Sequence, residues 1–340
     1  MKGQKNTVLA NNVLLLWSGL LLFLSPLITS QQEYLVAVEA GSKLPQTLAH
    51  SVAAYDGNDT IYVFGGYNET CPPSYLSDQI LRYTVSTDSI EVAARFPKGL
   101  CYGAVTSDNE GAYYFFGGYD EFEQSLAIYK FSSISGTVSQ VSFLPNGVIQ
   151  TASFQSNSKT SYVFGGGLVA TSIIKFDTET DTITDVIPMP VEYDQMLSFW
   201  DNVNQVAYIF GSRRPTPGAE PVMVFSPESN EITTLTNFTF YEFEYPTRGV
   251  MTTDGIYGYG VGGFFPYDSI MQFHLQSLET KYVPVLNHPG ANGTEFWGAG
   301  AAYVNSLNRI YFFGGVSYKS GGDSNFNDKI WFIDLSPLDG

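Results

Sequence analysis

The sequence predicts an all-β fold made of six copies of one unit, and three observations carry this prediction. First, six apolar runs end in glycine, and the first glycine of each ending falls at positions 65, 117, 165, 211, 262 and 314. Second, the intervals of 52, 48, 46, 51 and 52 residues define a period near fifty. Third, aromatic residues and glycine are abundant, whereas no long segment has the apolar period of a helix.

Each unit repeats the same order of four strands. A strand of small residues comes first, as at His50–Tyr55, Gly103–Ser107, Thr151–Gln155 and Gly298–Val304. The aromatic strand that follows is a continuous apolar run, which predicts burial on both of its faces. A third strand leads through a polar turn to a fourth, outer strand, and the third strands are Ile80–Val85, Ile173–Phe176, Met223–Phe225, Met271–Leu275 and Ile330–Asp334. Four antiparallel strands repeated around an axis make a six-bladed β-propeller.

The paired glycines are expected to be structural. A strand that turns abruptly at the rim of a propeller needs backbone angles, including positive φ, that only glycine adopts without strain. A loop that cradles phosphate would need the N-terminus of a following helix, and none is readable after these glycines.

The two ends of the chain predict how the ring closes. The sixth unit has its third strand at Ile330–Asp334 and no fourth strand after it. The segment Glu33–Glu39 precedes the first unit and alternates Tyr34, Val36 and Val38 with other residues. We expect this segment to be the outer strand of the last blade, so that the two ends of the chain pair.

The period near fifty and the paired glycines resemble the kelch repeat, over almost all of residues 31–340. The resemblance implies that this range is one six-bladed kelch β-propeller. The usual repeat carries tryptophan near the start of the fourth strand. At that place this chain has Ile90, Ile183, Ile232 and Tyr282, and its fourth repeat ends in Gly211 and Ser212.

Residues 1–30 have the features of a secretory signal peptide. Lys2 and Lys5 precede the uncharged apolar run Val13–Leu24, and the small residue Ser30 offers a cleavage site. The run is shorter than the roughly 20 residues that span a bilayer. We therefore expect a secreted, extracellular protein with no membrane span.

The charge balance excludes one class of partner. Without residues 1–30 the 16 basic residues fall to 14 against 33 acidic ones, a net charge of −19. Phosphate backbones are bound through lysine and arginine, so we expect no nucleic acid partner. The acidic residues are dispersed through turns and loops, as on a soluble surface.

Two features fit export. Cys71 follows the second strand of the first unit and Cys101 precedes the first strand of the second unit, so we predict a Cys71–Cys101 disulfide. Four Asn-X-Ser/Thr sequons predict glycosylation at Asn58, Asn68, Asn237 and Asn292.

Ligands are expected at one face of the ring, which we call the upper face: the loops after each second strand and the loops that lead into each first strand. Tyrosine supplies contact area with a polar end, and arginine offers fixed hydrogen bonds to an anionic or hydroxyl-rich ligand. Phe296 and Trp297 are also aromatic candidates on this face, but they stand directly before an inner strand, so of the set they are the two most expected in the core. The candidate ligand-binding residues are Tyr67, Tyr119, Asp120, Glu121, Arg213, Arg214, Tyr245, Arg248, Tyr267 and Tyr318.

Relatives of the kelch type include galactose oxidase, which holds copper with two histidines and two tyrosines, and plant specifier proteins, which carry iron. Here His50, His274 and His288 lie in different contexts, and none has aspartate four residues before it, so we expect no metal and no cofactor. Kelch-type sialic acid epimerases work without a metal. We therefore predict a monomeric module that binds a protein or glycan partner, with a metal-free sugar-modifying enzyme, epimerase- or mutarotase-like, as the alternative. No catalytic residue is assigned.

Overall fold

The computed structural model is an all-β propeller. It describes residues 34–68, 75–147, 149, 152–164, 170–212, 222–235, 250–262, 268–290, 294–319, 322 and 324–338. The chain from Tyr34 onward forms one compact unit. Within the described ranges, helix is confined to two short 3-10 turns, Asn305–Leu307 and Ser336–Leu338.

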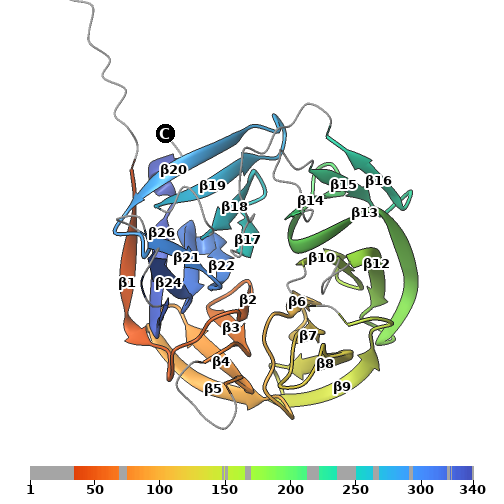
Figure 1. The fold of residues 1–340 in the computed structure, drawn as a ribbon, viewed down its shortest axis with the longest axis horizontal. Helices are drawn as coiled ribbons and strands as arrows, with labels where there is room; N and C mark the ends of the chain where they lie inside the picture. Colours follow the sequence, from red (N-terminus) through yellow and green to blue (C-terminus); the bar gives the residue numbers. More distant parts are fainter. Residues whose placement is uncertain are drawn as a thin grey trace, which may run out of the picture. The chain divides into compact units, whose positions relative to one another are not determined.

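Successive antiparallel strands form the blades, which follow one another around a ring (Figure 1). In the first three blades the inner strand comes first and the outer strand last. Blade 1 consists of β2 (Val52–Tyr55), β3 (Thr60–Phe64), β4 (Gln79–Thr84) and β5 (Ser89–Arg95); blade 2 of β6 (Ala104–Ser107), β7 (Ala112–Phe116), β8 (Ala127–Ser132) and β9 (Thr137–Phe143); blade 3 of β10 (Ala152–Asn157), β11 (Thr160–Phe164), β12 (Ala170–Asp177) and the first part of β13 (Thr182–Asp201).

The last three blades follow the same plan with two additions. A long strand is shared between blades 3 and 4. The strands of a small three-stranded sheet alternate along the chain with the strands of blade 6. Blade 4 consists of the second part of β13, β14 (Val206–Ser212), β15 (Met223–Ser226) and β16 (Glu231–Thr234); blade 5 of β17 (Val250–Thr253), β18 (Tyr257–Val261), β19 (Ser269–His274) and β20 (Thr280–Leu286); blade 6 of β22 (Gly300–Val304), β23 (Arg309–Phe313), β26 (Lys329–Asp334) and β1 (Leu35–Lys43); the small sheet of β21 (Thr294–Trp297), β24 (Val316–Lys319) and β25 (Ser324–Phe326).

Within the described ranges, hydrogen bonding joins these six four-stranded groups into four sheets, and the small sheet is the fifth. Blades 3 and 4 form one seven-stranded sheet because β13 pairs with β12 through its first part and with β14 through its second part. Blades 5 and 6 form one eight-stranded sheet because β1 pairs with both. The six-unit plan read from the sequence is thus present, and two of its junctions are continuous sheet.

The predicted closure of the ring by the N-terminal strand is confirmed. Strand β1 pairs antiparallel with β26, with Ala37 opposite Ile333. It also pairs in parallel with β20, where Leu35 lies opposite Val285, a contact that the sequence did not indicate. Figure 1 shows β1 between the edges of blades 5 and 6.

Strand β1 packs only one of its two faces on the core. Leu35 and Ala37 are buried, whereas Val36 and Val38 are exposed. The outer strand of a blade has one face on the core and one in solvent, so only alternate residues can be buried. Blade 1 holds the same strand from the other side: the Asp88 carboxylate accepts hydrogen bonds from the backbone N–H of Gly41 at 2.6 Å and from the Tyr83 hydroxyl at 2.9 Å.

The core lies mostly between neighbouring blades. All five residues of β7 are buried, as its continuous apolar run predicts. Rings meet across the junctions, for example Tyr83 of blade 1 with Phe313 of blade 6, whose centroids are 5.5 Å apart. Such aromatic pairs add to the free energy gained from burial alone.

The paired glycines have the positive φ that the sequence predicts, +57° at Gly65 and +66° at Gly314. The structure adds a second reason for glycine. A Cβ on Gly65 would overlap the carbonyl oxygen of Leu100, and a Cβ on Gly314 would overlap that of Leu48. The loop that leads into the next blade passes directly over the glycine pair, and no other residue leaves it enough room.

Removal of residues 31–40 should destabilise the propeller. It takes away most of β1, including the buried Leu35 and Ala37, and uncovers the edge of β26. We expect the free energy of unfolding to fall by about 3 kcal/mol or more, with a tendency to aggregate through the open edge. Thermal and urea denaturation of the truncated and the full mature chain would measure the loss.

A shorter truncation of residues 31–33, which leaves β1 whole, is the matched control and should melt like the mature chain. Equal melting of the chain without residues 31–40 would show that β1 does not hold the ring closed.

Candidate binding site

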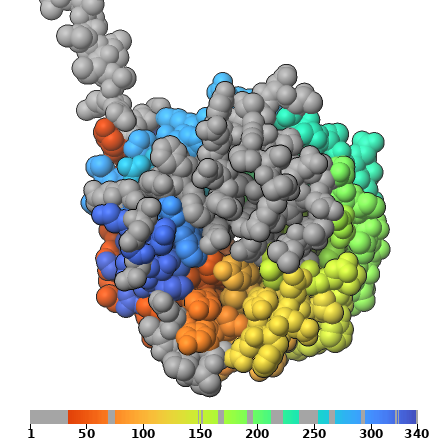
Figure 2. Space-filling model, in the orientation of Figure 1, coloured from red at the N-terminus to blue at the C-terminus, as the bar shows by residue number. Residues whose placement is uncertain are grey.

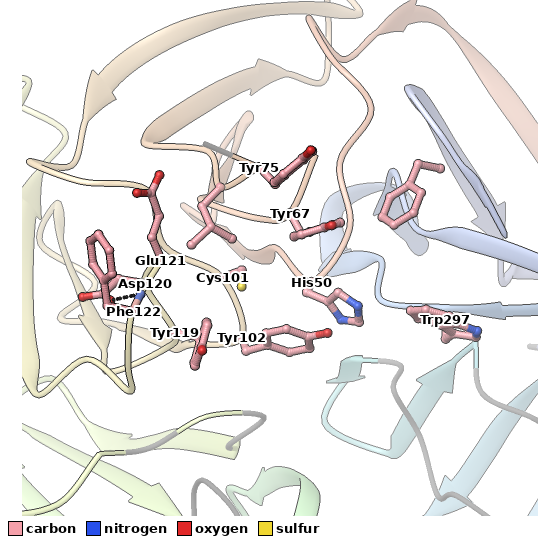
Figure 3. Close-up of a pocket in the computed structure, with 12 residues that line it drawn as sticks. His50, Tyr67, Tyr75, Cys101, Tyr102, Tyr119, Asp120, Glu121, Phe122 and Trp297 are labelled. Atoms are coloured by element: carbon pink, nitrogen blue, oxygen red, sulfur yellow. Dashed lines mark hydrogen bonds between the residues drawn. The ribbon is translucent and has the colours of Figure 1, made fainter. Parts of the chain in front are cut away.

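The upper face carries a pocket of about 600 Å³ where loops of blades 6, 1 and 2 meet (Figure 3). Figure 2 shows atoms of the first two blades, in orange and yellow, beside those of the last blade, in blue. The described residues that line the pocket are His50, Tyr67, Tyr75, Leu76, Cys101, Tyr102, Tyr119, Asp120, Glu121, Phe122, Trp297 and Phe326.

Three equivalent backbone positions lie at this site: two belong to lining residues, and the third, Gly298, follows the lining residue Trp297. His50, Tyr102 and Gly298 each stand two residues before the inner strand of their blade. Each has left-handed backbone angles, with φ of +55°, +60° and +74°. The backbone N–H of His50 donates to the Gly298 carbonyl at 2.5 Å, and the N–H of Tyr102 donates to the His50 carbonyl at 3.0 Å. The same backbone hydrogen bond therefore links the entry of blade 6 to that of blade 1, and the entry of blade 1 to that of blade 2.

The side chains of His50, Tyr102 and Trp297, the residue before Gly298, form a row of rings (Figure 3). The His50 and Tyr102 rings stack with centroids 3.9 Å apart, and the Trp297 ring lies 5.2 Å from His50 on the other side. Blade 6 has glycine at the equivalent position, and a Cβ there would come within 3.0 Å of His50 Cε1. Gly298 thus leaves room for the histidine ring.

A second group of rings comes from blade 1 and the small sheet. Tyr67 stacks on Tyr75 at 6.0 Å and approaches Phe326 at 5.4 Å. In the small sheet, Val316 of β24 lies opposite Trp297 on one side and Phe326 on the other. Residues that lie opposite each other in neighbouring strands point to the same face of a sheet, so Trp297 and Phe326 share one face. The sequence did not predict this small sheet, whose strands β21 and β25 supply Trp297 and Phe326 to the pocket.

The charged group of the site sits on the loop between β7 and β8. The Asp120 carboxylate is buried, pairs with Lys98 and accepts hydrogen bonds from the backbone N–H groups of Phe122 and Glu123 at 3.0 Å. Burial alone would raise the pKa of Asp120, but these hydrogen bonds lower it below its ordinary value. Glu121 is exposed and forms no ion pair with any described residue.

Four of the residues proposed from the sequence come together here: Tyr67, Tyr119, Asp120 and Glu121 all line the pocket. Tyr318 is half-buried on β24 and does not line it. The remaining candidates, Arg213, Arg214, Tyr245, Arg248 and Tyr267, lie outside the described residues.

Sequence reasoning missed the centre of the site. His50 was considered as a metal ligand and Tyr102 was not considered. Phe296 is buried as expected, but Trp297 is only half-buried and lines the pocket, so its assignment to the core was wrong. Alignment of the units would have shown that His50 and Tyr102 stand where the sixth unit has Gly298, and large side chains at a glycine-like position are a signal for function.

The described residues include only some of the predicted disulfide and glycosylation positions. Cys101 is buried and unpaired among the described residues, and burial raises the pKa of its thiol, while its predicted partner Cys71 and the sequons at Asn237 and Asn292 lie outside those residues. Asn58 is exposed in the turn between β2 and β3. Asn68 is buried with its amide hydrogen-bonded to Gln46 and Thr47, so a glycan there would have to replace these contacts.

No group of three or more histidine, cysteine, aspartate or glutamate side chains in the described part of the chain is arranged to hold a metal ion. In the same part of the chain, no helix combines the length and the apolar character needed to cross a bilayer.

No protein-family model matches the chain. No curated protein matches it either.

Substitution of Gly298 should disturb the ring row. Ala at this position would adopt a strained φ and press on His50, so Gly298→Ala should lower the free energy of unfolding by about 2 kcal/mol or more. Gly57→Ala is the matched control, because Gly57 has a similar φ of +80° with no atom within 4 Å of its added Cβ. It should cost about 1 kcal/mol. Urea denaturation would measure both, and equal losses would show that Gly298 does not make room for His50.

Proposed function

We propose that this chain is a secreted kelch-type propeller that binds a protein or glycan partner through its upper face. The observation that carries the proposal is the pocket of about 600 Å³, whose described lining is mainly aromatic. Pockets of this size, with many rings and few polar groups, commonly bind ligands. Rings also stack on the apolar faces of sugars and of protein side chains, so the lining suits either partner.

Backbone strain at the pocket supports binding. Left-handed angles cost a large residue about 1–2 kcal/mol, and both His50 and Tyr102 have them. Gly298 shows that the same backbone position accepts glycine, which carries no such cost. Rings kept at strained positions are commonly found at functional sites.

The alternative, a sugar-modifying enzyme in the same pocket, needs a general acid whose pKa is raised toward neutrality. The Asp120 pKa is shifted in the opposite direction, and its carboxylate is already occupied by Lys98 and two backbone N–H groups. Asp120 is therefore suited to holding its loop in place. Binding needs no proton transfer, which makes it the function we propose.

Export completes the proposal. The signal peptide at residues 1–30, the sequons and the two cysteines support it from the sequence. We expect the mature protein to be an extracellular monomer, with a glycan at the exposed Asn58.

A glycan array, combined with mass spectrometry of secreted proteins cross-linked to the mature chain, would test the binding function. Tyr119→Ala, and separately Arg213→Ala with Arg248→Ala, should each weaken binding of the ligand found by about 2 kcal/mol or more, as the loss of hot-spot residues does. Glu110→Ala, an exposed change in the turn between β6 and β7, should leave binding intact. Loss of binding in the Glu110 variant alone would refute the choice of face.

Peptide mapping without reductant would test the Cys71–Cys101 bond. We expect the secreted protein to yield one cross-linked peptide pair and no alkylated cysteine, because exported thiols seldom stay reduced. If the secreted protein is unfolded without reductant and both cysteines become alkylated, the bond does not form.

A further inference from the structure

We propose that the pocket at His50 takes a cationic group, the guanidinium or alkylammonium end of a basic side chain on a partner polypeptide. This inference rests on the proposed binding function and names the ligand class of the same site.

The walls of the pocket carry aromatic rings in two groups. His50, Tyr102 and Trp297 form one row, and Tyr67 with Phe326 forms a second group. A cation within about 6 Å of such a ring centroid is attracted by the electron-rich face, most strongly for tryptophan and tyrosine. Several rings around one pocket act on the same cation, and this arrangement is the usual means of binding quaternary ammonium groups.

The charges of the site select a cation over an anion. Among the described lining residues, the side chains of fixed charge are the carboxylates of Asp120 and Glu121, and none is lysine or arginine. Lys98 neutralises Asp120, so Glu121 supplies the uncompensated negative charge at the pocket. The whole chain, at a net charge of −17, adds an attractive field for positive ligands. A neutral sugar could stack on the rings but would gain nothing from this charge.

The geometry of the site adds a further reason. The backbone hydrogen bonds from His50 to Gly298 and from Tyr102 to His50 fix the backbone that carries these two rings, and the rings stack on each other with centroids 3.9 Å apart before any ligand arrives. Side chains that are already positioned lose little conformational entropy on binding, so even weak cation–ring attraction contributes to affinity.

The test uses the mature protein and two blocked pentapeptides, one with a central arginine flanked by glycines and one with citrulline, the uncharged isostere, in its place. Isothermal titration calorimetry at low salt and pH 8 should show binding of the arginine peptide and at least about tenfold weaker binding of the citrulline peptide. Raising the salt to 1 M should weaken the arginine peptide several-fold, because the Glu121 charge is exposed to screening.

Two pairs of variants locate the site. Glu121→Gln should weaken the arginine peptide about two- to fivefold, and Glu123→Gln, an exposed change two residues away that does not line the pocket, should not. Tyr75→Leu should weaken it about threefold or more through loss of a ring face, whereas Tyr34→Leu, at a similar exposure of 46% against 47%, should not. All four side chains are exposed, and thermal melts check that each variant folds.

Equal binding of the two peptides, or equal effects in both members of each variant pair, would overturn the cation proposal. The same titrations with chitotriose then decide the wider function. Binding of the sugar that Tyr75→Leu weakens would reject the cation while keeping a binding site in this pocket. Absence of binding by both peptides and the sugar, together with an unresponsive glycan array and no cross-linked partner, would reject the binding function as well.

Discussion

The contact on which the rest of the structure depends is the passage of a connecting loop over the glycine pair of the preceding blade, described at the entries to blades 1 and 2. The Gly66 N–H donates to the Leu100 carbonyl and the Gly315 N–H donates to the Leu48 carbonyl, both at 2.7 Å. Tyr102 and His50 follow these two leucines by two residues. The same backbone contact that sets the spacing of the blades therefore sets the height and direction of the rings in the pocket, which makes the fold and the site products of one repeated constraint.

The blades are held by different interactions at different distances from the axis. Near the upper face the links are backbone hydrogen bonds, between the blades they are packed rings such as Phe64 and Tyr113, and at the rim β1 joins blades 5 and 6 through its pairing with β20 and β26. A site assembled from three blades can keep its shape only if the blades do not move against one another, so these links also preorganise the pocket.

The sequence was sufficient for the repeat, the order of strands and the closure, because these follow from periodic patterns that each unit states again. It was insufficient where a single residue departs from the pattern or where distant loops meet. The register of β1 depends on which face of one short strand packs inward, and Val36 was as apolar as Leu35. Tyr67 and Phe326 are separated by most of the chain, so their 5.4 Å contact has no local signal. For His50 the sequence offers only the match to Gly298 when the units are aligned, and the left-handed backbone that gives this match its meaning is a property of the fold.

The position of β1 has a consequence for biosynthesis. The first strand of the compact unit to leave the ribosome, β1, must pair with β26, which is synthesised much later. Until β26 is made, blades 1 to 5 can form and β1 can pair with β20, while the ring stays open on the side of blade 6. The final step of folding is therefore a meeting of two ends separated by about 290 residues, as between Glu39 and Lys329, and the loop entropy for that step is lost only once the other blades have brought the ends close. Until then the apolar face of β1, with Leu35 and Ala37, is uncovered and needs protection by the chaperones of the compartment where the protein folds.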